Sequence, residues 1–280
     1  MKNFFVIANK SKNETEQFQT DIMAYINQKG GCCINDPNHT TNTDPSLVPE
    51  DTECVIVLGG DGTLLRVACD LLQRRIPLLG INMGTLGFLT AVEKSEAYKA
   101  IDRMMADDYI IETRMMIDAR VTTHDGVVES PTALNEVVVA GRRNMQLLNL
   151  SVFVNGQFLH SYRADGIIVA TPTGSTGYSL SAGGPIIAPT SQMLILSPIC
   201  PHSMHNRSIV LSREDVIEIV IDEGKYESEQ EAEVIFDAEK GIKLSTGDRV
   251  SVFASENVTQ IVRLKKEGFY ETLQDKLREK

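Results

Sequence analysis

The stretch VLGGDGTLLRVACD, residues 57–70, decides how the first part of the chain folds. It follows an apolar run, 54–58, with two glycines, an aspartate, a third glycine and then apolar residues at helical spacing. A short apolar run that stops at glycines is typical of a buried strand, and the spacing after it is typical of an amphipathic helix. We therefore predict a strand, a tight glycine turn that carries Asp61, and a helix that begins near Thr63.

The alternation of strand and helix extends outward from this turn. Apolar runs at 4–8 and 77–81 predict further buried strands, and patterns at 13–31 and 96–108 predict further helices. The faces we expect to be buried are Phe18, Ile22, Tyr25 and Ile26 in one helix and Leu65, Ala68, Cys69 and Leu72 in the helix after the turn. Buried strands that alternate with helices indicate a Rossmann-like α/β domain with a mainly parallel sheet over residues 1–110.

Beyond residue 110 the apolar period changes from about 3.6 to 2. Asn155-Gly156 separates two such runs and predicts a tight hairpin. More short strands follow with polar connections, so we predict an all-β domain, a β-sandwich, over 111–262. Residues 263–280 return to a helical pattern, and we expect this segment to pack back on the first domain.

The bulk composition excludes some functions. The net charge of −11 argues against general affinity for nucleic acid or for an anionic membrane. A phosphorylated ligand would therefore be bound by local interactions, with backbone N–H groups, helix N-termini, a few arginines or a divalent metal.

The cysteines and the N-terminus indicate a cellular compartment. Five scattered cysteines without a CxxC pair predict reduced thiols in a cytoplasmic protein. The start of the chain reads as a first strand that is too short for a signal peptide, and no later run approaches the length of a membrane span.

Several interpretations of the glycine turn compete. A dinucleotide fingerprint needs a third glycine at position 65, which is Leu, and a P-loop needs a Lys-Ser/Thr pair that GGDGTLLR lacks. A third interpretation is that the glycines let a phosphorylated substrate approach the backbone, with Asp61 facing it. The structural alternative is that Asp61 only caps the helix.

An aspartate near phosphates is electrostatically unfavourable unless it meets a metal or accepts a proton. The turn therefore favours phosphoryl transfer with Asp61 as general base to a hydroxyl. Arg66, one turn into the helix, could reach a phosphate or could be an ordinary solvated arginine.

A second glycine-rich stretch, RADGIIVATPTGSTGYSLSAGGP, covers residues 163–185. After the strand, its residues are mostly Thr, Ser, Gly and Pro, which suit ribose, phosphate and base edges better than a core. Tyr178 offers an aromatic face for stacking, and Tyr178 and Leu180 argue against a merely flexible linker.

With this stretch, nearly the whole chain resembles the NAD kinase family, whose members phosphorylate the 2′-hydroxyl of the adenosine ribose of NAD. The resemblance includes GGDGT (59–63), GINMGTLGFL (80–89), LNEVVV (134–139), DGIIVATPTGSTGYSLSAGGPII (165–187) and PHSMHNRSIVL (201–211). Diacylglycerol kinases and phosphofructokinases carry similar GGDG turns, whereas the TPTGST–Y–SLSAGGP block is far more specific.

The resemblance implies a role for particular residues. Asp61 matches the proton acceptor, and Asn135-Glu136 match a pair that contacts NAD, although alone they would read as a strand entry. Phe88 matches an apolar contact near adenine, with core packing as the alternative. The candidate NAD-binding residues are Asp61, Gly62, Arg66, Phe88, Asn135, Glu136, Arg163, Asp165, Thr176, Gly177, Tyr178, Ser179, Leu180 and Ser181.

The chain departs from the family pattern at two places. Gly177 stands where the family usually has Ala, and Ala238 stands where an Asp-Gly turn is usual, which leaves the role of Asp237 open.

The resemblance also implies partners. We expect NAD and ATP or another phosphoryl donor as substrates, Mg²⁺ or another divalent metal bound with the donor and not by metal-ligating side chains of the chain, and a homodimer or homotetramer. The alternatives are a lipid or sphingoid kinase that shares the GGDGT turn and a catalytically silent NAD-binding sensor.

Overall fold

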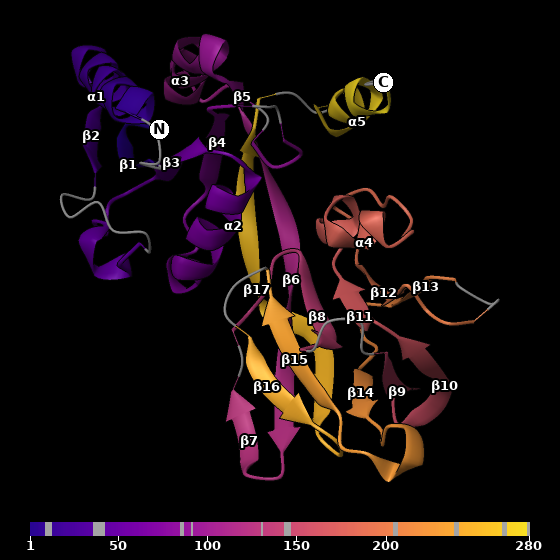
Figure 1. Cartoon of the computed structure of the whole chain (residues 1–280). Helices are drawn as coiled ribbons and strands as arrows, with labels where there is room; N and C mark the ends of the chain where they lie inside the picture. Colours follow the sequence, from indigo (N-terminus) through magenta and orange to yellow (C-terminus); the bar gives the residue numbers. More distant parts are fainter. Residues whose placement is uncertain are drawn as a thin grey trace. The chain divides into compact units, whose positions relative to one another are not determined.

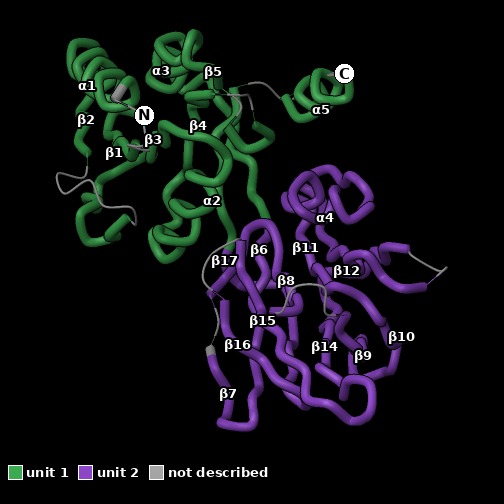
Figure 2. Tube along the Cα trace, viewed as in Figure 1, with its two compact units in different colours: residues 1–114, 258–280 green, residues 115–257 purple. Residues whose placement is uncertain are grey.

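The computed structural model describes residues 1–8, 13–35, 43–84, 87–90, 92–129, 131–142, 147–203, 207–237, 241–264 and 268–278. The chain divides into two compact units, one made of residues 1–114 and 258–280 and the other of residues 115–257 (Figure 2). The boundary falls twice inside long strands, in β6 (Ile110–Thr123) and in β17 (Arg249–Arg263), so each of these strands belongs to both units.

The first unit has a parallel sheet. Its strands are β1 (Asn3–Ala8), β2 (Cys32–Asn35), β3 (Cys54–Gly59), β4 (Leu78–Asn82), β5 (Val92–Glu93) and the end of β17 (Figure 1). They follow the order β17-β4-β3-β1-β2, with β5 also paired to β4, and every one of these pairs is parallel. The helices of this unit are α1 (Asn13–Gln28), α2 (Asp61–Asp70), α3 (Ala97–Met105) and α5 (Gly268–Arg278). The predicted mainly parallel α/β domain is therefore confirmed.

The buried face of helix α1 largely follows the helical spacing of its apolar residues. Phe18, Ile22 and Ile26 are buried on one face of the helix, as predicted, whereas Tyr25, the fourth residue of the predicted face, is half-buried. The helix is followed by Gly30 with φ of +86°, a left-handed conformation that glycine adopts without the steric cost of a Cβ.

Helix α2 corrects one prediction. Its buried side chains include Leu64, Val67 and Ala68, whereas the predicted stripe of Leu65, Ala68, Cys69 and Leu72 is wrong apart from Ala68. The helix begins at Asp61, not near Thr63, and Leu64 packs so tightly on β4 that a Cβ at Gly80 would lie 2.7 Å from its Cδ1 atom. Contact with the sheet, not helical spacing, decides which stripe is buried.

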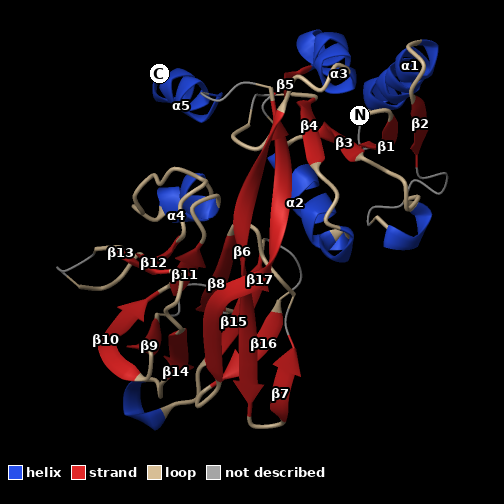
Figure 3. Cartoon of the chain, turned by 180° about the vertical axis from the view of Figure 1, so that it is seen from behind, coloured by secondary structure: helices blue, strands red, loops and turns tan. Residues whose placement is uncertain are grey.

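The second unit consists almost entirely of antiparallel strands (Figure 3). One sheet has the order β13 (Ile209–Ser212), β12 (Met193–Ile199), β11 (Gly166–Ala170), β8 (Glu136–Gly141), β15 (Glu231–Phe236) and β16 (Ile242–Ser245). The other contains β10 (Gln157–Ala164), β9 (Leu148–Val154), β14 (Ile217–Ile221) and β17, and β17 also pairs with β6, which pairs with β7 (Gly126–Glu129). Apolar side chains of both sheets form one core, which confirms the predicted β-sandwich.

The connections of this unit match the local sequence signals. Asn155 and Gly156 have φ of +51° and +77°, as a type I′ turn requires, and they join β9 to β10 as predicted. The short helix α4 (Tyr178–Ser181) and a 3-10 turn (Gly174–Thr176) form the loop after β11. Other 3-10 turns cover Pro45–Leu47, Leu72–Arg74, Lys94–Glu96 and Lys225–Glu227.

The C-terminal helix α5 belongs to the first unit, as predicted. The ring of Phe269, at its start, lies 6.1 Å from the ring of Phe88. Among the residues that the structure describes, no helix has the length and hydropathy needed to cross a bilayer.

Candidate active site

The glycine turn lies at the end of β3, where Gly60 is the N-cap residue of α2. The Gly60 carbonyl accepts hydrogen bonds from the N–H groups of Thr63 and Leu64 at 3.0 and 3.2 Å. No side chain caps this helix, so the alternative in which Asp61 only caps α2 is wrong.

The carboxylate of Asp61 instead binds the backbone of segment 87–90, which follows β4. Oδ2 accepts from the N–H of Phe88 at 2.8 Å. Oδ1 accepts from the N–H groups of Leu89 (3.2 Å) and Thr90 (2.9 Å) and from the Thr90 hydroxyl (2.8 Å). Since a carboxylate oxygen has about two lone-pair sites, Oδ1 is saturated and Oδ2 retains accepting capacity.

The glycines around Asp61 differ in the space that is available for a side chain. A Cβ at Gly87 would lie 1.9 Å from Oδ1 of Asp61, and a Cβ at Gly59 would lie 2.5 Å from the Thr63 hydroxyl. A Cβ at Gly60 or Gly62 would meet no atom of the described residues within 4 Å beyond the local backbone, and neither residue has a positive φ. The protein's own packing therefore requires glycine at positions 59 and 87. Gly60 and Gly62 are exposed, and at these two positions the backbone of the turn is not covered by a side chain.

Arg66 lies one turn into α2 and is half-buried. Its Nε atom is buried and has no hydrogen-bond partner among the described residues. Burial raises the pKa of the neighbouring Asp70 carboxyl, and the Arg66 charge partly opposes that shift. A buried donor without a partner is costly, so the side chain has bonding capacity left for a ligand.

Asp237 organises the candidate site of the second unit. Its carboxylate accepts from the backbone N–H groups of Leu134 (2.6 Å), Asn135 (2.9 Å) and Glu136 (2.9 Å). The sequence left the role of Asp237 open, and these bonds show that it holds the Asn-Glu pair in place. Ala238, the departure next to it, lies outside the described residues.

The Asn-Glu pair presents buried acceptors. Asn135 Oδ1 and Glu136 Oε2 are both buried and have no hydrogen-bond partner among the described residues. Burial, and then the charge of Asp237, raises the pKa of the Glu136 carboxyl to about 7, while the Tyr178 backbone N–H lowers it. Acceptors left open in this way suit the hydroxyl and amino groups of a ligand.

The packing around Gly177 explains why glycine stands here in place of the alanine that is usual in the family. A Cβ at this position would lie 2.9 Å from Glu136 Oε2, so an alanine would displace the carboxylate. A Cβ at Gly174 would lie 2.2 Å from the Asn135 carbonyl oxygen, so the loop after β11 packs directly on the Asn-Glu pair.

The Glu136→Gln variant should be more stable than the wild type at pH 8, by on the order of 2 kcal/mol. From about pH 4.5 to 7 the folded wild type holds more protons at this carboxyl than the unfolded chain, so its stability falls as the pH rises through that window. Urea unfolding at pH 5 and pH 8 should show a gap that widens at the higher pH. The same change at the exposed Glu229 serves as control, and an equally wide gap at both pH values would contradict the account.

The other predicted residues of the second unit differ in exposure. Tyr178, Leu180 and Ser181 are exposed, and Thr176 and Gly177 are half-buried. Ser179 is fully buried, with its hydroxyl 3.3 Å from that of Ser197, so its side chain serves the packing of the loop.

Arg163 and Asp165 are exposed at the end of β10, whereas Tyr162 and Ala164 are buried. This is the alternation expected of a strand, and it places both charged side chains on the same face.

The described residues contain no group of three or more His, Cys, Asp and Glu side chains that could hold a metal ion. The five cysteines are free thiols.

Gly87, Thr90 and the function of Asp237 were not predicted from the sequence. Gly87, the second glycine of GTLGFL (84–89), was the available signal, because glycine is often used where another group approaches the backbone closely.

The chain is similar to known proteins over nearly its whole length. Residues 3–109 match the model of the ATP-NAD kinase N-terminal domain, and residues 134–264 match that of the ATP-NAD kinase C-terminal domain. The chain is 43% identical to the NAD kinase of Agathobacter rectalis over 99% of each chain and 40% identical to that of Lachnoclostridium phytofermentans over 100% of each.

Two solved structures have the same fold. An NAD kinase from Archaeoglobus fulgidus in complex with ATP has a TM-score of 0.78 at 25% identity and covers 97% of each chain. Yeast NADH kinase complexed with NADH has a TM-score of 0.87 at 23% identity and covers 99% of this chain and 87% of its own. With relatives that are 40% and 43% identical over 99% or more of each chain, the chain belongs to the NAD kinase family.

Proposed function

We propose that this member of the NAD kinase family, which converts NAD to NADP, uses Asp61 to accept the proton of the 2′-hydroxyl of the adenosine ribose. The observation that carries the proposal is the bonding of its carboxylate. Three donors saturate Oδ1, one donor binds Oδ2, and the adjoining Gly60 and Gly62 add no side chain. Oδ2 is therefore a fixed acceptor beside an open stretch of backbone.

The chemistry suits such a group. A carboxylate is a weak base for a hydroxyl, but the transition state of phosphoryl transfer is loose and needs little early deprotonation. Backbone N–H groups at the start of α2 and the helix dipole favour the charge that develops on the phosphate. Arg66 Nε supplies a further donor.

Residues of the second unit bind the dinucleotide in this proposal. Asn135 pairs with an edge of the adenine, and Glu136 accepts from ribose hydroxyls, which uses the two open acceptors. Tyr178 supplies a stacking face. Arg163 binds nearer the pyrophosphate or nicotinamide end, and Asp165 is a further contact to NAD. Phe88, a residue of the first unit, contacts the adenine side.

ATP, or another phosphoryl donor, supplies the terminal phosphate. A divalent metal such as Mg²⁺ would neutralise charge on the phosphates of the donor, which are its ligands when a protein offers too few of its own.

An assay of NADP formation tests the function. It compares ATP, other nucleoside triphosphates and polyphosphate as donors, NAD and NADH as acceptors, and reactions with and without Mg²⁺. NADP formed from NAD supports the proposal, whereas calorimetric binding of NAD with no NADP from any donor would support a silent NAD-binding sensor. The family match leaves no support for a lipid or sphingoid kinase.

Gly62→Ala should lower turnover by about 10-fold or more without loss of stability. An added Cβ would meet no atom of the described part of the chain within 4 Å beyond the local backbone, and alanine is favoured over glycine in a helix by roughly 1 kcal/mol. The methyl would instead occupy space that the substrate needs. The measurement is kcat together with the urea midpoint, and unchanged turnover would show that no substrate approaches this residue.

The assembly and location belong to the proposal as well. We propose a homodimer or homotetramer in the cytoplasm. The free cysteines support a reducing compartment. The net charge of −11 argues against general affinity for nucleic acid.

A further inference from the structure

Segment 87–90 is held from both sides. Its N–H groups at Phe88, Leu89 and Thr90 donate to Asp61, while two of its carbonyl groups accept from Arg263. Arg263 Nη2 lies 2.9 Å from the Phe88 carbonyl oxygen, and Nη1 lies 3.4 Å from that of Leu89. The same peptide groups therefore connect Arg263 to Asp61.

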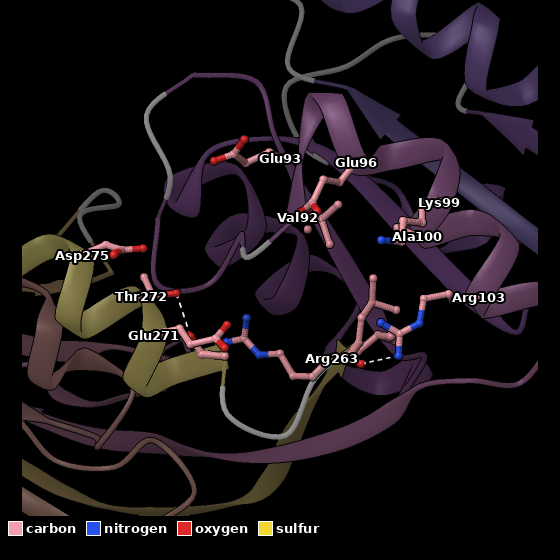
Figure 4. Close-up of a pocket in the computed structure, with 14 residues that line it drawn as sticks. Val92, Glu93, Glu96, Lys99, Ala100, Arg103, Arg263, Glu271, Thr272 and Asp275 are labelled. Carbon is pink, nitrogen blue, oxygen red and sulfur yellow. Dashed lines mark hydrogen bonds between the residues drawn. The ribbon is translucent and has the colours of Figure 1, made fainter.

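Arg263 is itself anchored. It ends β17, only 5% of it is exposed, and its Nε lies 3.2 Å from Oε2 of Glu112 in β6. Arg114, 1% exposed, binds the same oxygen at 2.5 Å. Figure 4 labels Arg263 among the residues that line a cavity of about 200 Å³, opposite Glu271 of α5.

This cluster is costly to bury. Two guanidinium groups share one carboxylate, and burial, followed by the charge of Arg263, lowers the pKa of Arg114 to about 10. Replacing buried ion pairs by apolar side chains is often neutral or stabilising, so stability alone is a poor reason for such a cluster. A role in fixing the position of neighbouring backbone groups explains the cluster better than stability does.

We propose that Arg263 is a positioning residue for Asp61. It fixes the carbonyl groups of segment 87–90, which fixes the N–H groups that orient the carboxylate and leaves Oδ2 in place for the ribose hydroxyl. The inference rests on the proposed role of Asp61 as proton acceptor. A planar guanidinium binds a carboxylate and two carbonyl groups at once, whereas the compact ammonium of lysine cannot span all three.

The test is a double-mutant cycle of Arg263→Lys and Asp61→Asn, read as kcat and KM for NAD. Arg263→Lys should lower kcat by about 10- to 100-fold, since a shift of about 1 Å in a reacting group has such an effect, and should change KM for NAD less than about 3-fold. In the Asp61→Asn background the same substitution should cause no further loss, because its effect passes through the carboxylate.

The matched control is Arg249→Lys. Arg249 lies on the same strand and pairs with Glu218, but it is largely exposed. Its substitution should leave kcat unchanged in both backgrounds.

Hydrogen exchange gives a second readout. The amides of residues 88–90 should exchange at least about 10-fold faster in Arg263→Lys than in the wild type, and those of β3 should not change. If Arg263→Lys fails to fold, Glu112→Gln weakens the anchor while keeping both arginines, and its kcat should fall in the same direction.

Two results would overturn the inference. One is a wild-type kcat in the folded Arg263→Lys protein, and the other is an equal loss of kcat in both backgrounds, as a merely structural role predicts. Near-wild-type turnover in Asp61→Asn alone would instead reject the proposed function, and the inference with it, so the two failures are distinguishable.

Discussion

Replacing Asp61 with Asn is expected to lower turnover by about 10²- to 10⁴-fold while NAD still binds. The amide oxygen can still accept from the N–H groups of Leu89 and Thr90. The amide nitrogen, in the place of Oδ2, cannot accept a proton and faces the N–H donor of Phe88. The measurement is kcat for NADP formation, with NAD affinity from calorimetry.

Thr90→Val is the matched control for this variant. It removes the hydroxyl that donates to Oδ1, together with the bond from Asn82, but it leaves Oδ2 unchanged. We expect a loss of about 1–2 kcal/mol in stability and less than about 10-fold in kcat. Turnover near the wild-type value in Asp61→Asn would contradict the assigned role.

Gly87→Ala is expected to lower kcat by about 100-fold or more, because the new methyl group and the Asp61 carboxylate would occupy the same space. Its Cβ would lie 1.9 Å from Oδ1 and 2.3 Å from Cγ of Asp61. The carboxylate must move and lose its bonds to segment 87–90, and such overpacking typically costs about 1–3 kcal/mol of stability.

Gly84→Ala, in the same stretch, is the control for this second variant. The nearest atom of the described residues, apart from its chain neighbours, would be Asn82 Oδ1 at 3.9 Å from the new Cβ, so activity should be retained. Steady-state kinetics and thermal unfolding of both variants provide the comparison. A Gly87→Ala protein with wild-type kcat would show that the observed carboxylate position is not needed for catalysis.

The sequence predicted the secondary structure well where a single periodicity was present. The buried face of α1 and the Asn155-Gly156 hairpin are examples. In α2 two overlapping stripes have the same spacing, one beginning at Leu64 and the other at Leu65. Helical periodicity cannot choose between them, and the choice comes from the fit of Leu64 against Gly80 of the neighbouring strand.

The site was predicted only in part, because its contacts depend on strand order. β4 lies beside both β3 and β17, so the carboxyl ends of three parallel strands are adjacent at one edge of the sheet. That order brings Asp61, segment 87–90 and Arg263 together across large separations in the sequence. Local pattern identifies the glycine turn and the Asn-Glu pair, but it contains no information on which backbone groups they meet.

The central claim is that Oδ2 of Asp61 accepts the proton of the ribose 2′-hydroxyl. The most direct test is a crystal structure with NAD bound, in which the distance from Oδ2 to the 2′-oxygen is measured. We predict a distance of about 2.6–3.2 Å, with Oδ1 still bound to segment 87–90. A 2′-oxygen beyond hydrogen-bond reach of Asp61 in every subunit, with no water to connect them, would contradict the account.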